Sequence, residues 1–311
     1  MRPGALVAWS ALACAAVAVL AICAGSTGWR PPWAWTAMVG ELRAPRVLLG
    51  GVVGASLAVA GVAMQAVLHN ELADPYVLGV SGGASLGAVA SLAIWPGLAP
   101  GPAAAAGATA AAALVRGLAR GPYDPTRLLL AGVALGSVLA SATGAILVLA
   151  PASQLLRSAT GWLFGGLGTP PWSALIAPAI AAGGATAWLS AQATRIDRLT
   201  LGADVAAALG VAVPRLRRRL LVIAVALTAL AVAAAGLIGF VGLVAPHASR
   251  RLVGSPHRHA IGLAALLGAS LVMAADAIAR TAFAPRELPV GVVTASLGGP
   301  MFLWQLQRGT R

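Results

Sequence analysis

The sequence has no lysine and only eight acidic residues among its 311 positions, and charged residues make up 9% of it. A soluble domain of this length is about a quarter charged and about 45–50% apolar. Here 59% of the residues are apolar, and the mean hydropathy is +0.88. So few polar side chains could not cover a soluble fold. The composition predicts an all-α, polytopic membrane protein with a single transmembrane domain over residues 1–311.

Missing motifs disfavour several kinds of chemistry. The phosphate loop G-x-x-x-x-G-K-[ST] is absent, which predicts a chain that hydrolyses no nucleotide itself. There is no H-E-x-x-H pair, and no paired membrane carboxylates or Ser–His constellation supports an intramembrane enzyme. The two cysteines, Cys14 and Cys23, share one apolar stretch at a spacing that gives no metal site and disfavours a disulfide. We therefore expect no catalytic residue, no metal site and no permanently bound cofactor.

Ten apolar stretches are candidates for membrane spans, which need about 17–25 residues. The first follows a basic start, as in a signal peptide, but the further spans favour an uncleaved helix. The eighth is short and is interrupted by Pro246. The ten predicted spans are Leu6–Ala24, Val47–Leu68, Val77–Trp95, Pro102–Leu118, Leu128–Ala150, Trp172–Ala191, Leu220–Gly236, Leu237–Leu252, Ile261–Phe283 and Val290–Leu306.

The arginines indicate how these spans are oriented. If the N-terminus is cytoplasmic and the spans alternate, fifteen of the 21 arginines fall on the cytoplasmic side and six outside. Cytoplasmic loops of membrane proteins carry such an excess of positive charge. The count predicts an even number of spans with both termini in the cytoplasm. This distribution of arginines also explains the net charge of +13, so no nucleic-acid partner is expected. The expected surrounding of the chain is membrane lipid.

Two stretches share short patterns in the same order. In the first, "GASL" at Gly54 is followed by "EL" at Glu71 and "GVSGGASLG" at Gly79. In the second, "GASL" at Gly268 is followed by "EL" at Glu287 and "GVVTASLG" at Gly291. Internal duplication is common in transporters. One interpretation is an internal repeat, roughly residues 47–150 and 220–306. Chance recurrence in a chain rich in Ala, Gly and Leu is the other.

Several longer blocks carry a resemblance to a known family. They are "LRAPRVLLGGVVGASLAVAGVAMQ" from Leu42 with "HNELADPYVLGVSGGASLG" after it, "TRLLLAGVALG", "LGADVAAALGV", "GLIGFVGLVAPHASRRLVGSPHRH" and "ADAIARTAFAPRELPVGVVTASLGGPMFLW". In this order, over residues 43–304, the chain resembles the FecCD-type permease subunits of ABC importers for iron-siderophores, haem or cobalamin. Vitamin B12 and haem permeases look most similar. One departure is Glu71, where the family usually has proline.

The resemblance implies a type II ABC importer permease fold of about ten transmembrane helices, working as a homodimer in a bacterial inner membrane. Two cytoplasmic ATPase subunits, on which ATP acts, and a periplasmic substrate-binding protein would be its partners. The cargo would be a bulky metal-chelate cofactor entering the cytoplasm, with haem as the best guess and cobalamin or a ferric siderophore as alternatives. A different class, an ion-coupled secondary transporter, needs buried ionisable residues, for which Asp276 is the strong candidate.

Three arginines are the predicted docking site for the binding protein. Arg43 and Arg46 precede the second span and Arg280 ends the ninth. By resemblance, they would pair with acidic side chains on that protein. Interfacial anchoring of the arginines is the alternative. Asp276 lies one helical turn before Arg280, a spacing that favours local charge neutralisation over a proton relay.

The segment "LTLGADVAAALGVAVPRLRRR" from Leu199 predicts a short amphipathic element between the sixth and seventh spans. The resemblance implies that it is the coupling helix that fits the ATPase, with a plain interfacial helix as the alternative. "YDPTR" from Tyr123 occupies the family's cytoplasmic gate, although the residues alone indicate only a turn. The coupling residues would be Leu201, Gly202, Asp204, Ala208, Leu209 and Gly210, and the gate residues Asp124, Pro125 and Thr126.

Four further positions have two interpretations each. Arg157, in an outer interfacial piece, either attracts anionic groups of the cargo at the pathway mouth or is structural. Gly132 and Gly136 either allow close helix contact or line the pathway. For His247, a local hydrogen-bonding role is favoured over haem ligation.

The break between the second and third spans holds two of the eight acidic residues, Glu71 and Asp74. One interpretation is that these acids form turns and begin a helix, because the start of a helix carries partial positive charge and favours acidic side chains. Contact with a cytoplasmic ATPase is the alternative interpretation.

Overall fold

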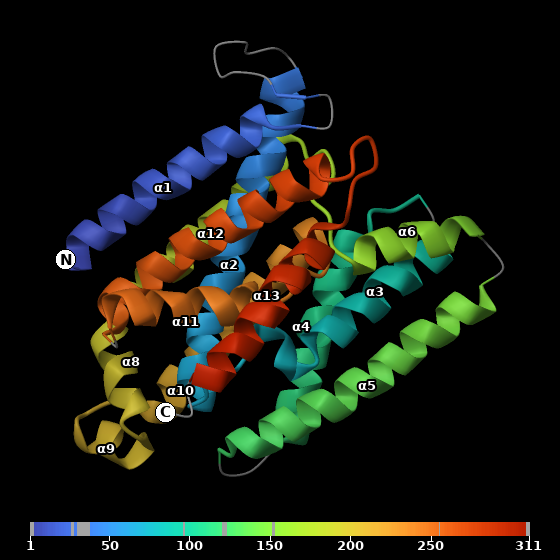
Figure 1. Ribbon diagram of the computed structural model, residues 1–311. Helices are drawn as coiled ribbons and strands as arrows, with labels where there is room; N and C mark the ends of the chain where they lie inside the picture. Colours follow the sequence, from blue (N-terminus) through green and yellow to red (C-terminus); the bar gives the residue numbers. More distant parts are fainter. Residues whose placement is uncertain are drawn as a thin grey trace.

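The computed structural model describes residues 3–25, 28–29, 38–95, 97–119, 123–150, 153–254 and 256–308. Within these ranges the chain forms helices and no strand (Figure 1). They are α1 (Pro3–Cys23), the π-helical turn η1 (Met38–Arg43), α2 (Ala44–Leu68), the 3₁₀ turn η2 (Pro75–Leu78), α3 (Val80–Ile94), α4 (Pro100–Leu118), α5 (Pro125–Leu149), α6 (Ser153–Leu163), the 3₁₀ turn η3 (Trp172–Leu175), α7 (Ile176–Ala191), α8 (Ala193–Thr200), α9 (Ala203–Ala208), α10 (Val213–Ala235), α11 (Val241–Val253), α12 (His257–Thr281) and α13 (Val290–Arg308).

Helix length and composition identify the membrane-spanning part. Six helical segments in the described ranges are long and apolar enough to cross a membrane: α1, η1 with α2, α5, η3 with α7, α10 and α12. Shorter apolar helices occur in α3 and over Val290–Phe302 of α13. Each of the ten predicted stretches contains a helix. The prediction of an all-helical, polytopic membrane protein is therefore confirmed.

The eighth predicted span is shorter than expected. Its helix, α11, has 13 residues, which is about 20 Å of helix against a hydrocarbon core of about 30 Å. The preceding residues cannot extend it, because Gly236 (φ 67°) and Phe240 (φ 68°) adopt left-handed backbone angles. Residues 237–240 are therefore non-helical, and Pro246 lies inside α11 as expected.

Helix α2 forms the centre of the bundle. It packs against α10, α11, α12 and α7, and most of its residues are buried (Figure 1). Its sequence is small and apolar on every side, which is the pattern of a helix enclosed by others. In contrast, α1 and α5 are largely exposed along their apolar lengths, as expected for helices facing lipid or a partner.

Glycines allow the closest helix contacts around α2. Gly54 of α2 and Gly268 of α12 face each other, and a Cβ on either would collide with the backbone of the other. Each of these glycines begins a "GASL" stretch, so two copies of the recurring motif pack against each other. About two turns further along α2, Gly61 lies against the backbone of Gly242 in α11. Small residues at helix contacts let backbones approach in this way.

Gly61→Ala is expected to destabilise the protein, because the added methyl group overlaps the Gly242 carbonyl and forces α2 and α11 apart. Overpacking costs about 1–3 kcal/mol, which lowers Tm by roughly 3–10 °C. Thermal unfolding in detergent, followed by tryptophan fluorescence, measures the change. Gly262→Ala in α12 is the matched control, since a Cβ there meets no atom within 4 Å. Equal Tm values for the two variants would contradict the packing argument.

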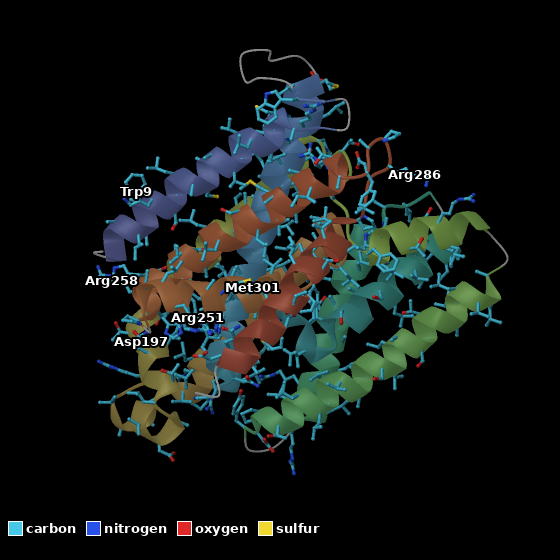
Figure 2. All side chains as sticks on the ribbon, viewed as in Figure 1. Trp9, Asp197, Arg251, Arg258, Arg286 and Met301 are labelled. Carbon is cyan, nitrogen blue, oxygen red and sulfur yellow. The ribbon has the colours of Figure 1, made fainter. Side chains whose placement is uncertain are left out.

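The two ends of the bundle differ in their charged groups. The end that carries α8, α9 and the start of α10 is called the α9 end, and the end that carries η1 and the turn between α12 and α13 is called the η1 end. Figure 2 shows Asp197, Arg251 and Arg258 toward the end of the bundle that carries α8, whereas Arg286 lies at the η1 end. The sites predicted for coupling and for docking thus lie at opposite ends of the bundle.

Candidate functional site

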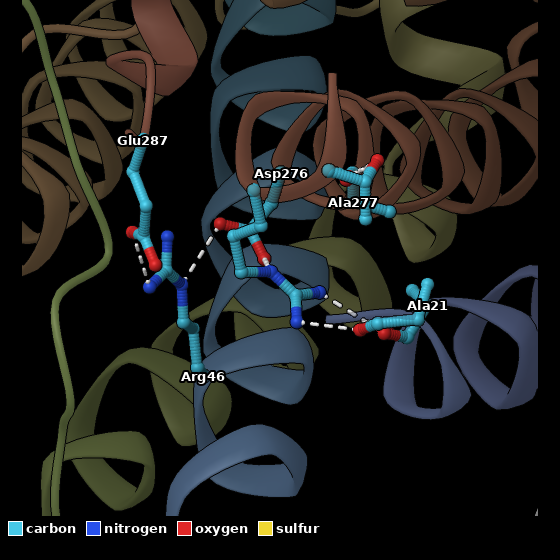
Figure 3. Close-up of polar contacts among 8 residues, drawn as sticks. Ala21, Arg46, Asp276, Ala277 and Glu287 are labelled. Carbon is cyan, nitrogen blue, oxygen red and sulfur yellow. Dashed lines mark hydrogen bonds and ion pairs between the residues drawn. The ribbon is translucent and has the colours of Figure 1, made fainter. Parts of the chain in front are cut away.

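At the η1 end a buried carboxylate holds two arginines. Asp276 is completely buried, and its two oxygens accept hydrogen bonds from Arg46 Nε (3.0 Å) and Arg280 Nε (2.9 Å) (Figure 3). Arg46 Nη1 also donates to Glu287 Oε2 at 2.9 Å, and Glu287 is the exposed member at 43%. The predicted pairing of Asp276 with Arg280 is present. These four residues are called the Asp276 cluster.

Two of the predicted docking arginines bind the end of α1. Arg280 donates to the carbonyls of Ala24 (2.9 Å) and Ala21 (3.0 Å), and Arg43 donates to the carbonyl of Cys23 (2.9 Å). The last carbonyls of a helix lack intrahelical partners and favour nearby cations. Arg43 is 7% exposed and Arg280 3%, so neither side chain extends into solvent. Both therefore serve as caps for α1, and their docking role stays a prediction.

The contact between Arg46 and the acids was missed in the sequence. Arg46 lies 230 positions before Asp276 and 241 before Glu287, whereas the i,i+4 pair was readable locally. The sequence held only a weak indication of this contact, which is that Arg46 and Glu287 both lie close to the ends of predicted spans. With both oxygens of Asp276 held by cations, charge neutralisation is favoured over a proton relay.

At the α9 end the predicted coupling segment is exposed. Leu201, Val205 and Leu209 are 64%, 47% and 47% exposed, and Ala208 is also exposed. Large apolar side chains gathered on an exposed surface mark a contact with a partner or membrane. Val205 was not among the predicted residues, although it lies four positions from both Leu201 and Leu209. We call α8 and α9 together the lever.

The lever is two helices rather than the one segment predicted. α8 ends at Thr200, and Gly202 (φ 111°) redirects the chain before α9 begins. Asp204 lies in the first turn of α9, where a negative charge is favourable. Gly210 (φ 80°) ends α9, where the Gly210 N–H donates to the carbonyl of Ala207 and the Val211 N–H to the carbonyl of Ala206, both at 2.9 Å. This is the glycine C-cap in which a left-handed residue closes a helix.

Polar contacts attach the lever to the core helices. His69 follows α2, and its Nε2 donates to the carbonyl of Leu199 at 2.8 Å. Asp197 of α8 accepts from the backbone amide of His257 (3.0 Å) and lies 2.6 Å from its Nδ1. The lever is thus joined to the end of α2 and to the start of α12. No pattern in the sequence links these residues.

The acidic break between α2 and α3 is a set of turns. Asp74 Oδ1 accepts from the amide of Tyr76 at 2.9 Å, which caps η2 and confirms the turn interpretation for this residue. Burial raises the pKa of Asp74 to about 6, and the hydrogen bond from the backbone N–H of Tyr76 opposes that rise. Glu71 remains exposed, with its oxygens 3.6 Å from Arg250 Nε and 3.7 Å from His247 Nδ1. His247 therefore takes part in a local contact.

The predicted gate residues begin a helix. Asp124 Oδ1 accepts from the amide of Thr126 at 2.8 Å, and Pro125 is the first residue of α5. Beside them, Tyr123 donates to the carbonyl of Val67 at 2.7 Å, and the Arg217 guanidinium lies 3.9 Å from its ring centroid. Burial raises the pKa of Tyr123 to about 12, against the opposing charge of Arg217. The gating role stays a prediction.

Two of the predicted pathway residues lie one helical turn apart on α5, and the third lies on α6. Gly132 of α5 is buried against the carbonyl of Val77, and Gly136 lies near Gly79, so both allow α5 to pack on η2. This favours the packing interpretation. Arg157 is exposed on the short helix α6. Among the residues that the structure describes, no group of three or more His, Cys, Asp or Glu side chains could hold a metal ion.

The FecCD transport family matches residues 9–308. The chain belongs to the FecCD transport family. Among FecCD relatives, the vitamin B12 import system permease protein BtuC of Vibrio cholerae is 41% identical over 304 residues, covering 94% of this chain and 90% of the relative. The hemin transport system permease protein HmuU of Yersinia pestis is 40% identical over 277 residues, covering 86% and 82%.

A solved structure confirms the fold of this FecCD chain. A metal-chelate type ABC transporter in an inward-facing conformation has a TM-score of 0.89 and 26% identity, covering 98% of this chain and 99% of the other. PsaBC from Streptococcus pneumoniae shares the fold at a TM-score of 0.60, covering 86% and 92%. At 15% identity, this second likeness concerns the fold alone.

Proposed function

We propose that this chain is the membrane-spanning permease subunit of an ABC importer that carries a bulky metal-chelate cofactor, haem or cobalamin, into the cytoplasm. The observation that carries the proposal is the match to cobalamin and haem permeases over most of the chain. The exposed lever supports it, because a subunit without a phosphate loop needs a surface on which an ATPase can act.

The proposed assembly contains two copies of this chain in the inner membrane. Two ATPase subunits bind the levers at the α9 end, the side that the arginine distribution predicts to be cytoplasmic. A periplasmic binding protein docks at the η1 end. There, Arg46 is the docking arginine of choice, because its partner Glu287 is exposed and can be exchanged for an acid of the binding protein. Exposed pairs of this kind contribute about 0–1 kcal/mol each and mainly fix register.

The contacts of the lever suggest how ATP-driven motion reaches the bundle. When the ATPases close, they displace α8 and α9. The Asp197–His257 and His69–Leu199 contacts pass this displacement to α12 and α2. Those two helices are joined again at the η1 end, since Arg46 of α2 binds Asp276 of α12. Closure of the ATPases would therefore move both the α9 end and the η1 end of the bundle.

Haem, the best guess from the resemblance, and cobalamin are equally supported as the cargo, because identities of 40% and 41% to the two kinds of permease do not separate them. We expect ATP hydrolysis by the complete complex in proteoliposomes to rise with binding protein loaded with haem or cobalamin. Binding protein loaded with a ferric siderophore should leave it near the rate given by the empty protein.

Two results would overturn this proposal. Stimulation by the siderophore-loaded protein alone would exclude the proposed cargo. Uptake by the purified chain without ATPase, driven by an ion gradient, would establish the secondary-transporter alternative.

A further inference from the structure

A cleft at the α9 end between α4, α5 and α10 has a basic mouth and an apolar interior. Its mouth is a cavity of about 600 Å³ lined by Arg116, Tyr123, Arg217 and Arg218, among others. An adjoining groove of about 290 Å³ shares Arg116 and Arg218 with the mouth. The rest of its lining is mainly aliphatic, including Leu78, Ala112, Leu221 and Val225. The combined cleft is therefore amphipathic.

The mouth has an excess of positive charge. Three arginines line it, and Asp124 is the carboxylate among its described lining residues. The Asp124 side chain is already engaged, since one oxygen caps α5 and the other lies 3.9 Å from Arg127. Arg217 stacks on Tyr123, and its buried Nε has no hydrogen-bond partner in the described structure. The mouth thus offers guanidinium groups that an anion could bind.

A second apolar groove meets the same turn of α10. It has a volume of about 250 Å³ and lies between α7 and α10, where Trp188 and Ile223 line it together with Arg218, Arg219 and Val222. Arg218 and Val222 also line the groove beside α4. Val222 is 63% exposed, so it forms an apolar ridge with a groove on either side and Arg218 at its end.

We infer that this cleft binds an anionic phospholipid. Its phosphate would lie among Arg116, Arg217 and Arg218, and its two acyl chains would occupy the grooves on either side of Val222. Arginine matches the geometry of phosphate oxygens, and basic pockets between transmembrane helices bind anionic headgroups. The start of α10 adds the positive end of its helix dipole.

The surroundings favour a membrane lipid over a soluble anion. Leu114 and Leu118 on α4 are exposed at 55% and 69%, so apolar side chains continue from the cleft onto the outer surface. A soluble anion would gain nothing from that surface, whereas acyl chains would cover it. The site also has a structural consequence. The lipid would lie between the start of α10, which follows the lever, and the predicted gate at Asp124.

The test measures lipid binding to the purified full-length chain by native mass spectrometry. Phosphatidylglycerol and phosphatidylcholine with the same acyl chains are compared for the wild type and for Arg116→Gln/Arg218→Gln. The wild type is expected to prefer phosphatidylglycerol, and the variant to lose about tenfold or more of that preference. Arg215→Gln/Arg258→Gln is the matched control, because it removes the same charge from the α9 end outside the cleft. It should retain the preference.

Four outcomes would overturn the inference. The first is equal binding of both lipids to the wild type. The second is an equal loss in the control, which would show attraction to general charge. Full displacement of the lipid by inorganic phosphate or glycerol phosphate would show a phosphate site without an acyl component. Displacement by haem or cobalamin would assign the cleft to cargo, a result that leaves the proposed importer function intact.

Discussion

Asp276→Ala is expected to lower the Tm of the purified protein by about 10 °C or more. The substitution leaves Arg46 and Arg280 without the carboxylate that both bind, and Arg280 is almost fully buried. Removing one partner of a buried ion pair costs about 3–5 kcal/mol, because an uncompensated charge stays inside the protein. Because Arg280 also holds the end of α1, that helix should detach from α12 at a lower temperature.

Glu287→Ala is the matched control for this experiment. It removes an acid from the same cluster, but Glu287 is exposed and contacts Arg46 alone among the described pairs. Its loss should change Tm by no more than about 3 °C, as exposed ion pairs contribute little. Thermal unfolding in detergent, monitored by tryptophan fluorescence, compares the two variants. Similar Tm values for them would show that the Asp276 cluster is not a structural centre.

Val205→Asp/Leu209→Asp is expected to reduce ATP-driven cargo uptake by about tenfold or more, while hydrolysis by the ATPase subunits continues. Both side chains are about half exposed on the lever, and the buried core of a protein interface is apolar and depleted of charged residues. Charges there would weaken the grip of the ATPase on this subunit. Uptake and hydrolysis, measured in the same proteoliposomes, give the number of ATP molecules used per cargo molecule.

Val205→Leu/Leu209→Met is the control for the lever, because it keeps both positions apolar. This variant should transport at nearly the wild-type rate. Gly210→Ala is a second way to disturb the lever. Alanine is strained at φ 80°, so this substitution would loosen the end of α9 without adding charge. Normal uptake by the aspartate variant would show that the lever does not couple the two reactions.

Apolar run length predicted the helices well, because membrane spans leave a long and local pattern. It overestimated α11, where the left-handed Phe240 stops the helix without any change in hydrophobicity. Local spacing also predicted the Asp276–Arg280 pair. The burial of Arg43 could not be predicted, since a sequence does not show that the carbonyls of α1 lie beside it. Surface arginines and arginines that cap a distant helix look the same in a sequence.

In the lever, too, features set by neighbouring residues in the sequence were easier to predict than contacts between distant residues. Gly210 ends α9, as a glycine in the sequence can indicate, but the break between α8 and α9 at Gly202 was not predicted. The attachment of α8 through Asp197 and His257 joins residues 60 positions apart, and no periodicity connects them. Contacts between residues that are close in space but distant in the sequence could therefore be identified only from the structure.

The interlocked glycines of α2 and α12 restrict how this bundle can deform. Sliding one helix along the other would bring side chains against the backbone where Gly54 and Gly268 now meet, so shear between them is blocked. Tilting them as a single rigid body breaks none of these contacts. Alternation between two openings would then arise from tilting of this pair relative to elements such as α5, which packs on α3, α4 and η2, rather than from sliding of one helix along another.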